Sequence, residues 1–211
     1  MAIPRQTASR LSFDMTTYVR VRTYVVGPSY WEPMFQQEIK RKMHPFMAEM
    51  CYDATADKVH AELELEGKDY LAESVAISPE NRIPRKELHC LIQKLEELRT
   101  EAQNEPPNSL LKQIFIGLYL PEPSAAPELY RLYRHEGNTR LAIIWGLLPK
   151  NDKRGHSLQN LNIRRFFPSE YVERGIGATL RVLALISAVA LITAIVSYIC
   201  FRTEISEFIG A

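Results

Sequence analysis

The chain has 211 residues, of which 46% are hydrophobic and 24% are charged, and its formal net charge at pH 7 is +1. A charge so close to zero argues against a strongly basic nucleic-acid-binding domain and against a long acidic tail. The three cysteines, Cys51, Cys90 and Cys200, are far apart and form no Cys-x-x-Cys pair. The sequence therefore predicts neither a disulfide framework nor a cysteine-based metal site.

The first elements are a strand and a helix. Residues 17–26 alternate between valines on one face and Arg20 and Arg22 on the other, which is typical of a half-buried strand. Residues 29–50 carry apolar side chains near helical spacing. Pro33 suits a first helical turn, and Pro45 should break the helix after Met43.

A hairpin is expected over residues 58–77. Apolar and polar residues alternate from Val59 to Glu66, and Gly67-Lys68 could form a type II′ turn that returns the chain as a strand over residues 70–77. The outward-facing Glu62 and Glu64 would complement Arg20 and Arg22 if the two strands are neighbours. Two separate solvated rows of charge are an equal alternative.

Four more elements follow. Residues 84–102 have one apolar stripe and predict an amphipathic helix. Residues 114–120 are nearly all apolar and predict a buried strand. Ser124 could cap a short helix that runs through His135, with Gly137 in its C-terminal turn. Residues 141–148 predict a second buried strand.

These elements predict an α+β fold. The first six have the ferredoxin-like order β-α-β-β-α-β, and the last helix and strand would extend the sheet. We expect residues 1–149 to form a cytoplasmic domain and residues 150–180 to form a basic juxtamembrane linker. Fold order alone indicates little about function.

A transmembrane helix is predicted at residues 181–202. Between Arg181 and Arg202 the chain has no charged residue, and most of its side chains are apolar or small. A bilayer core about 30 Å thick needs about 20 helical residues. The basic residues before the helix, which are Lys150, Lys153, Arg154, Arg164, Arg165, Arg174 and Arg181, outnumber the single Arg202 after it. This asymmetry places the N-terminal side in the cytoplasm and residues 203–211 across the membrane, in a tail-anchored layout.

Small residues follow one face of this helix. Ser187, Ala190, Ala194 and Ser197 have the spacing of a heptad seam, which would let a second helix approach closely. The partner would be another copy of the chain or a different membrane subunit. Chance is the alternative, since alanine and serine are common in this segment.

The sequence predicts no catalytic residues, no metal ligands and no cofactor. None of the five histidines has a ligand partner three or four residues away, and no phosphate-binding or nucleophile motif is present. Arg131, Arg134 and Arg140 could bind an anion or an acidic partner, although a solvated helix end explains them as well. Five basic residues before the membrane are candidates for contact with lipid headgroups, namely Lys150, Lys153, Arg154, Arg164 and Arg165.

We therefore expect a non-catalytic scaffold or assembly subunit of a larger membrane complex. Its partners would be membrane lipid and other membrane subunits or its own copy, without nucleic acid. A ligand-sensing or regulatory module at the membrane is the alternative, and an enzyme without a local motif is a further one. A bacterial inner membrane is favoured over an organellar membrane.

Overall fold

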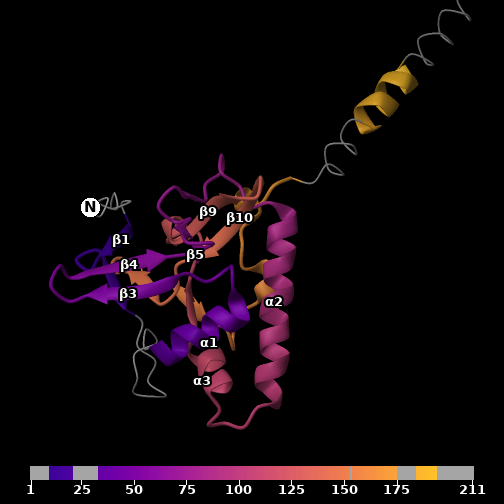
Figure 1. The fold of residues 1–211 in the computed structure, drawn as a ribbon. Helices are drawn as coiled ribbons and strands as arrows, with labels where there is room; N and C mark the ends of the chain where they lie inside the picture. The colour runs from indigo at the N-terminus through magenta and orange to yellow at the C-terminus, as the bar shows by residue number, and fades with distance from the viewer. Residues whose placement is uncertain (1–9, 21–32, 153, 175–183, 194–211) are drawn as a thin grey trace, which may run out of the picture. The chain divides into compact units, whose positions relative to one another are not determined.

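The computed structural model describes residues 10–20, 33–152, 154–174 and 184–193. The chain divides into two compact units, Met1–Glu173 and Arg174–Ala211. The first unit has an α+β fold, as the sequence predicts. Its described helices are α1 (Pro33–Met43), α2 (Arg85–Asn104) and α3 (Leu110–Gly117). In Figure 1 strands β1, β3 and β4 lie at one side of this unit and α2 lies at the other.

The described strands form small antiparallel sheets rather than one large sheet. One three-stranded sheet has the order β1-β4-β3, and these strands span Leu11–Asp14, Lys58–Glu62 and Glu49–Asp53. The other has the order β10-β9-β7, and its strands span Asn138–Ile143, Tyr130–His135 and Val75–Ala76. Among the described residues no sheet has more than three strands, so the expected ferredoxin-like sheet is not found there.

Three two-stranded pairs complete the strand pairing. β2 (Tyr18–Arg20) pairs with β11 (Leu147–Pro149), β8 (Tyr119–Pro121) pairs with β12 (Gly155–Ser157), and β5 (Glu64–Leu65) pairs with β6 (Lys68–Asp69). The rest of the strand expected at residues 17–26 lies outside the described residues. Among the described residues β2 pairs with β11 and not with β4, which carries Glu62. Glu62 instead forms an ion pair with Arg10 at 2.7 Å.

Both helices with clear periodicity are confirmed. α1 begins at Pro33 and ends at Met43, two residues before Pro45. α2 covers the predicted segment and buries a stripe that includes Leu91, Leu95 and Leu98. A regular apolar stripe predicts a helix well because the same residues that set its period make its tertiary contacts.

The predicted strand at residues 114–120 is wrong in its first part, which is the helix α3. Ser109 begins this helix, and its side-chain oxygen accepts a hydrogen bond from the Lys112 N–H at 3.2 Å. Leu111, Ile114 and Phe115 then fall on one buried face. A short apolar run does not distinguish a buried helix from a buried strand, and the cap at Ser109 decides it here.

The predicted helix from Ser124 to His135 is also wrong. A single 3-10 turn spans Pro127–Leu129, and β9 follows it directly. Gly137 lies in the tight turn between β9 and β10, where Glu136 and Gly137 have φ values of 49° and 76°. The predicted strand at residues 141–148 is divided between β10 and β11, and Gly146 has a φ of 72° at the break.

The turn predicted at Gly67-Lys68 lies one residue earlier. Glu66 and Gly67 have φ values of 53° and 78°, which is the type I′ pattern, and they join β5 to β6. β6 is two residues long, and β4 pairs instead with β1 and β3. Of the expected return strand over residues 70–77, Val75 and Ala76 pair with β9.

Part of the segment expected as a linker packs into the first unit. Leu158, Leu161, Ile163 and Phe166 are buried in its core, and Tyr171 accepts a backbone hydrogen bond from Ile83 at 2.8 Å. The described core therefore continues past Pro149 to the end of this unit. Apolar residues spaced through a polar segment provide this packing.

Of the second unit, residues 184–193 are described and are helical. This stretch carries five large apolar side chains that are 57–70% exposed, which are Leu185, Ile186, Val189, Leu191 and Ile192. Within the described ranges no helix is both long and apolar enough to cross a bilayer. The remainder of the predicted transmembrane segment lies outside those ranges.

Candidate functional site

A groove with a volume of about 660 Å³ lies between α2, α3 and the segment that follows β12. Glu96, Arg99 and Gln103 line it from α2, and Lys112, Phe115 and Ile116 line it from α3. Residues 159–164 supply its remaining wall. We call this feature the α2–α3 groove. Its volume is within the range of small-ligand sites, which is roughly 300–1,000 Å³.

The groove has an apolar floor beneath a polar rim. Phe115, Leu161 and Ile163 are each at most 5% exposed and form part of the floor. The rim carries four side-chain amides, from Gln103, Gln159, Asn160 and Asn162. Such a surface can bury an apolar group while its amides donate and accept hydrogen bonds.

Positive charge predominates along the groove. Its lining includes Arg99, Lys112 and Arg164, against the single acid Glu96. Arg164 Nε lies 3.2 Å from a carboxylate oxygen of Glu96, but the two side chains are 76% and 41% exposed. This pair is therefore weak and can exchange for another partner.

The other two cations are held by backbone oxygens. Arg99 donates to the carbonyls of Leu158 and Leu161, at 3.3 and 2.6 Å, and so fixes the segment that forms one wall. Lys112 Nζ donates to the carbonyl of Ala102 at 2.9 Å. Neither cation is neutralised by these bonds, because carbonyl oxygens carry no formal charge. Together they would favour an anionic ligand.

Arg131, Arg134 and Arg140, which the sequence predicts as anion contacts, differ from one another in their surroundings. Arg131 hydrogen-bonds to both the hydroxyl and the carbonyl of Ser74, and its burial lowers the pKa of its guanidinium. Arg140 forms an ion pair with the buried Glu87. Alternation along β9 places Arg134 on the opposite face from Arg131 and Tyr133. Two of the three arginines thus have internal partners.

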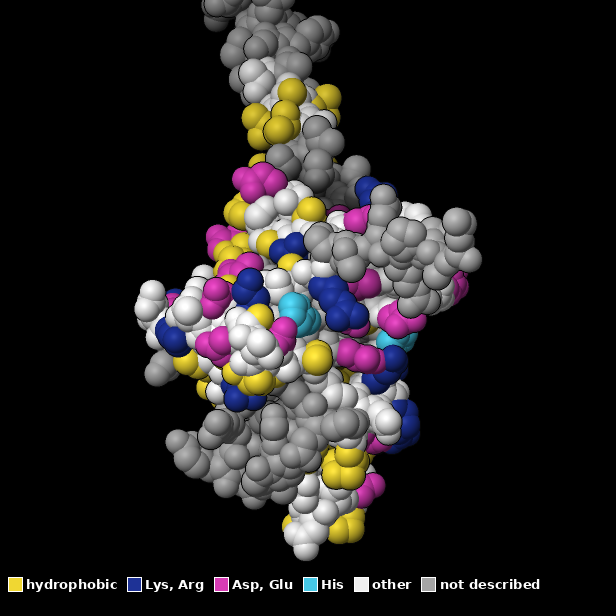
Figure 2. Space-filling view, turned by 60° about the vertical axis from the view of Figure 1, so that its left-hand side comes forward, with side chains coloured by type: hydrophobic (Ala, Val, Ile, Leu, Met, Phe, Trp, Pro, Cys, Tyr) yellow, Lys and Arg dark blue, Asp and Glu magenta, His cyan; other side chains and the backbone are white. Residues whose placement is uncertain are grey.

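The residues predicted to contact lipid headgroups also have different surroundings from one another. Arg154 forms an ion pair with Asp152, Arg164 lies in the α2–α3 groove, and the backbone of Lys150 bonds to Thr17. Arg165 is exposed, and Lys153 lies outside the described residues. On the face shown in Figure 2, acidic and basic side chains are interspersed.

Two of the four residues of the small-residue seam belong to the described part of the second unit. Ser187 and Ala190 are both exposed and lie in the helix at residues 184–193, three positions apart and therefore on one face. Ala194 and Ser197 lie outside the described residues.

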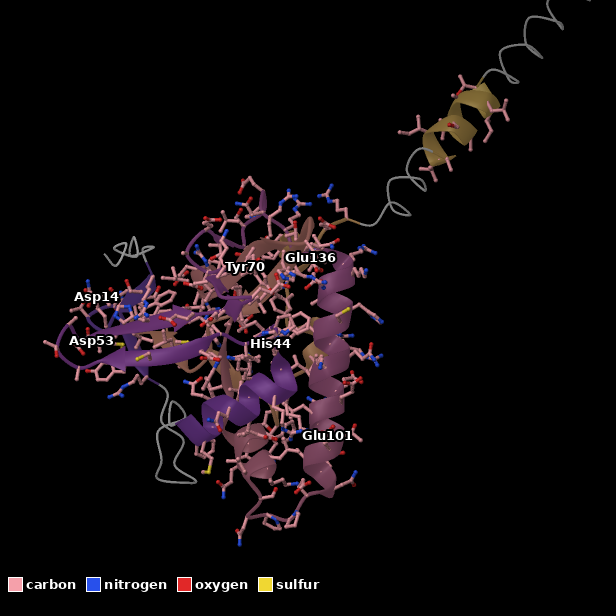
Figure 3. The ribbon with its side chains drawn as sticks, in the orientation of Figure 1. Asp14, His44, Asp53, Tyr70, Glu101 and Glu136 are labelled. Atoms are coloured by element: carbon pink, nitrogen blue, oxygen red, sulfur yellow. The ribbon has the colours of Figure 1, made fainter. Side chains whose placement is uncertain are left out.

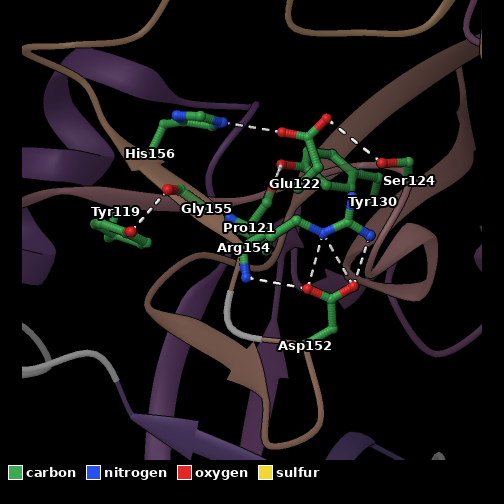
Figure 4. A network of polar contacts seen from close by, with 9 residues as sticks. All are labelled: Tyr119, Pro121, Glu122, Ser124, Tyr130, Asp152, Arg154, Gly155 and His156. Atoms are coloured by element: carbon green, nitrogen blue, oxygen red, sulfur yellow. Dashed lines mark hydrogen bonds and ion pairs between the residues drawn. The ribbon is translucent and has the colours of Figure 1, made fainter.

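A polar network near β8 and β12 includes a serine, a glutamate and a histidine (Figure 4). His156 Nε2 lies 3.0 Å from one oxygen of Glu122, and the Ser124 hydroxyl lies 3.5 Å from the other. The carboxylate thus lies between serine and histidine, so the imidazole is not placed to take the serine proton. The network joins the two strands, and we assign it no catalytic role.

Comparison of the chain with protein-family models, with curated proteins and with solved structures gives no match. The functional argument therefore rests on the geometry of this chain. Sequence reasoning missed Arg99 and Lys112, because they belong to two helices whose packing it did not foresee. The amides at Gln159, Asn160 and Asn162 were a usable signal, since they alternate with the apolar Leu158, Leu161 and Ile163.

Proposed function

We propose that the chain is a single-pass membrane protein and a non-catalytic assembly subunit of a larger membrane complex. Residues 181–202 serve as its anchor, and the first unit contacts partners at the cytoplasmic face. The observation that carries the proposal is the apolar run, whose described part is helical and exposes five large apolar side chains. A contiguous apolar surface of this kind marks a membrane or protein contact.

Alkaline extraction of isolated membranes tests the anchor. Val189→Lys with Ile192→Lys places two charges in the run, each unfavourable by about 2.5–3.5 kcal/mol near the centre of a bilayer. We expect the parent chain to stay in the membrane pellet and the lysine variant to be released. The matched control, Val189→Leu with Ile192→Leu, should stay in the pellet. Release of the parent chain would overturn the proposal.

The α2–α3 groove favours a second candidate function, which is recognition of an extended acidic segment of a partner protein. Apolar side chains of that segment would contact the floor at Phe115, and its carboxylates would face Arg164 and Lys112. This function is compatible with the first, because an assembly subunit needs a recognition surface.

Fluorescence anisotropy with a labelled peptide of alternating glutamate and leucine tests this recognition. Arg164→Gln and Lys112→Gln should each weaken its binding several-fold, and the effect should shrink with added salt. The control variant Lys58→Gln removes a charge from β4, outside the groove. Equal binding by all variants, or equal binding of a lysine–leucine peptide, would refute the groove as the recognition site.

A further inference from the structure

Two hairpin turns with the same dipeptide meet at one end of the first unit. Glu66-Gly67 joins β5 to β6, and Glu136-Gly137 joins β9 to β10. Both glutamates have positive φ values, at a turn position where asparagine, aspartate and glycine are preferred. Figure 3 shows Glu136 near Tyr70, at the end of the unit where β9 and β10 lie.

Three potential metal ligands converge between these turns. Ligand atoms of Glu66, His135 and Glu136 all lie within 4.8 Å of one another. His135 Nδ1 is 4.0 Å from a carboxylate oxygen of Glu136. The rings of Tyr70 and His135 pack in a T-shaped arrangement with their centroids 5.2 Å apart, which restricts the orientation of the imidazole.

Among the described residues, the buried Nε2 of His135 has no hydrogen-bond partner. The side chain of His135 is 18% exposed. The distance from Nδ1 to Glu136 is too long for a hydrogen bond. Buried polar groups usually have partners, so the unpartnered Nε2 leaves the imidazole able to coordinate a ligand, and Glu66 and Glu136 offer ligand atoms nearby.

Charge points to a cation as that ligand. Neither Glu66 nor Glu136 forms an ion pair with a lysine or arginine among the described residues, and the nearby Lys68 pairs with Glu73 at 3.1 Å. Two carboxylates held this close repel each other, and a divalent cation between them would cancel both charges.

We propose that Glu66, His135 and Glu136 bind one Zn²⁺ ion. A mixed set of imidazole and carboxylate ligands suits zinc, whereas Ca²⁺ and Mg²⁺ prefer oxygen alone. Ligands of a tetrahedral zinc site lie about 3.3 Å apart, given bonds of about 2.0–2.1 Å. The glutamate side chains must therefore move inward, which is feasible because Glu136 is 70% exposed. The three ligands leave a fourth position for water or for a ligand from a partner.

Zinc titration of the full chain in mild detergent, followed by calorimetry, tests the site. We expect one ion per chain, and we expect Glu66→Gln and Glu136→Gln each to weaken binding at least about tenfold. The matched control is Glu64→Gln, which removes the same charge from the exposed strand next to the turn. Zinc should also raise the unfolding temperature of the parent and of the control, but not that of the two turn variants.

Cobalt provides a separate readout, since the free thiols Cys51 and Cys90 could also bind zinc. Co²⁺ bound at the proposed site should give visible absorption without thiolate charge-transfer bands. A thiolate spectrum, equal zinc affinity in all variants, or no saturable binding at micromolar zinc would each overturn the proposal. Should a glutamine variant fail to fold, His135→Gln replaces it, and unchanged affinity in that variant would likewise overturn the site.

Discussion

Arg140 Nη1 lies 2.7 Å from a carboxylate oxygen of Glu87, and this ion pair joins β10 to the first turn of α2. Glu87 is 3% exposed, and its other oxygen accepts a hydrogen bond from the Leu141 N–H at 3.4 Å. A negative charge in the first turn of a helix is also stabilised by the helix dipole. Three favourable interactions therefore converge on one buried carboxylate.

Glu87→Gln should lower the free energy of unfolding by about 2 kcal/mol, because a neutral amide leaves the charge of Arg140 unpaired. Urea unfolding, followed by a spectroscopic signal from the first unit, measures this change in the free energy of unfolding. The control is Glu97→Gln on the exposed side of α2, which should change stability by less than about 0.5 kcal/mol. Equal effects of the two substitutions would contradict the assigned role of Glu87.

Ser109→Ala should reduce stability by about 1 kcal/mol, because it removes the side-chain acceptor for the Lys112 N–H at the start of α3. Circular dichroism during urea unfolding measures the loss. Ser109→Asp retains an acceptor and should keep most of the stability. If alanine and aspartate have the same effect, the cap does not contribute to α3.

Local sequence patterns predict the helices whose structure depends mainly on their own residues. α2 has a regular stripe, and α1 ends near Pro45, so neither depends on distant contacts for its assignment. The apolar run of α3 fits either a helix or a strand, and only the cap at Ser109 distinguishes the two. The strand pairing was missed because β2 meets β11 across more than a hundred residues, which no local pattern encodes.

The candidate sites also depend on long-range packing that local sequence patterns do not encode. The α2–α3 groove combines Arg99, Lys112 and Arg164 from three separate segments, and charge alone did not indicate that they share one surface. The repeated Glu-Gly dipeptide was visible in the sequence, but only the packing of the two hairpins brings Glu66 near His135. The apolar run, by contrast, needs no tertiary information to be recognised.

The stability of the first unit should fall between neutral and mildly acidic pH, in part because of His44. Burial lowers the pKa of His44 below its ordinary value of 6.5, the charge of Lys40 lowers it further, and Glu49 opposes these effects. The unfolded chain therefore binds a proton at His44 at a higher pH than the folded chain does. The loss begins as pH falls through 6.5 and is complete below the folded pKa.

Free energies of unfolding at pH 7.5 and pH 5.0 test this linkage. His44→Gln should lose less stability between the two pH values than the parent does, whereas His89→Gln, at an exposed position of α2, should lose as much as the parent. An identical pH dependence in the parent and in His44→Gln would refute the assignment.

The seam of Ser187, Ala190, Ala194 and Ser197 should pack against another transmembrane helix, if the anchor does more than hold the chain in the bilayer. An anchor that contacts lipid alone has no need for small residues on one face, because leucine or isoleucine would serve equally well. Close approach of two backbones adds dispersion contacts, and the serine hydroxyls could add about 0.6 kcal/mol each through interhelical hydrogen bonds.

Ala190→Leu with Ala194→Leu should therefore reduce recovery of the complex from mild detergent, because the larger side chains hold the two backbones apart while membrane insertion is kept or strengthened. The measurement compares variants at equal levels in the membrane. Leu185→Ile with Ile192→Leu is the matched control and should have a smaller effect, since these residues are already large and lie off the seam. If the double leucine variant assembles as well as the parent, the spacing of small residues is chance composition, and the helix acts as an anchor alone.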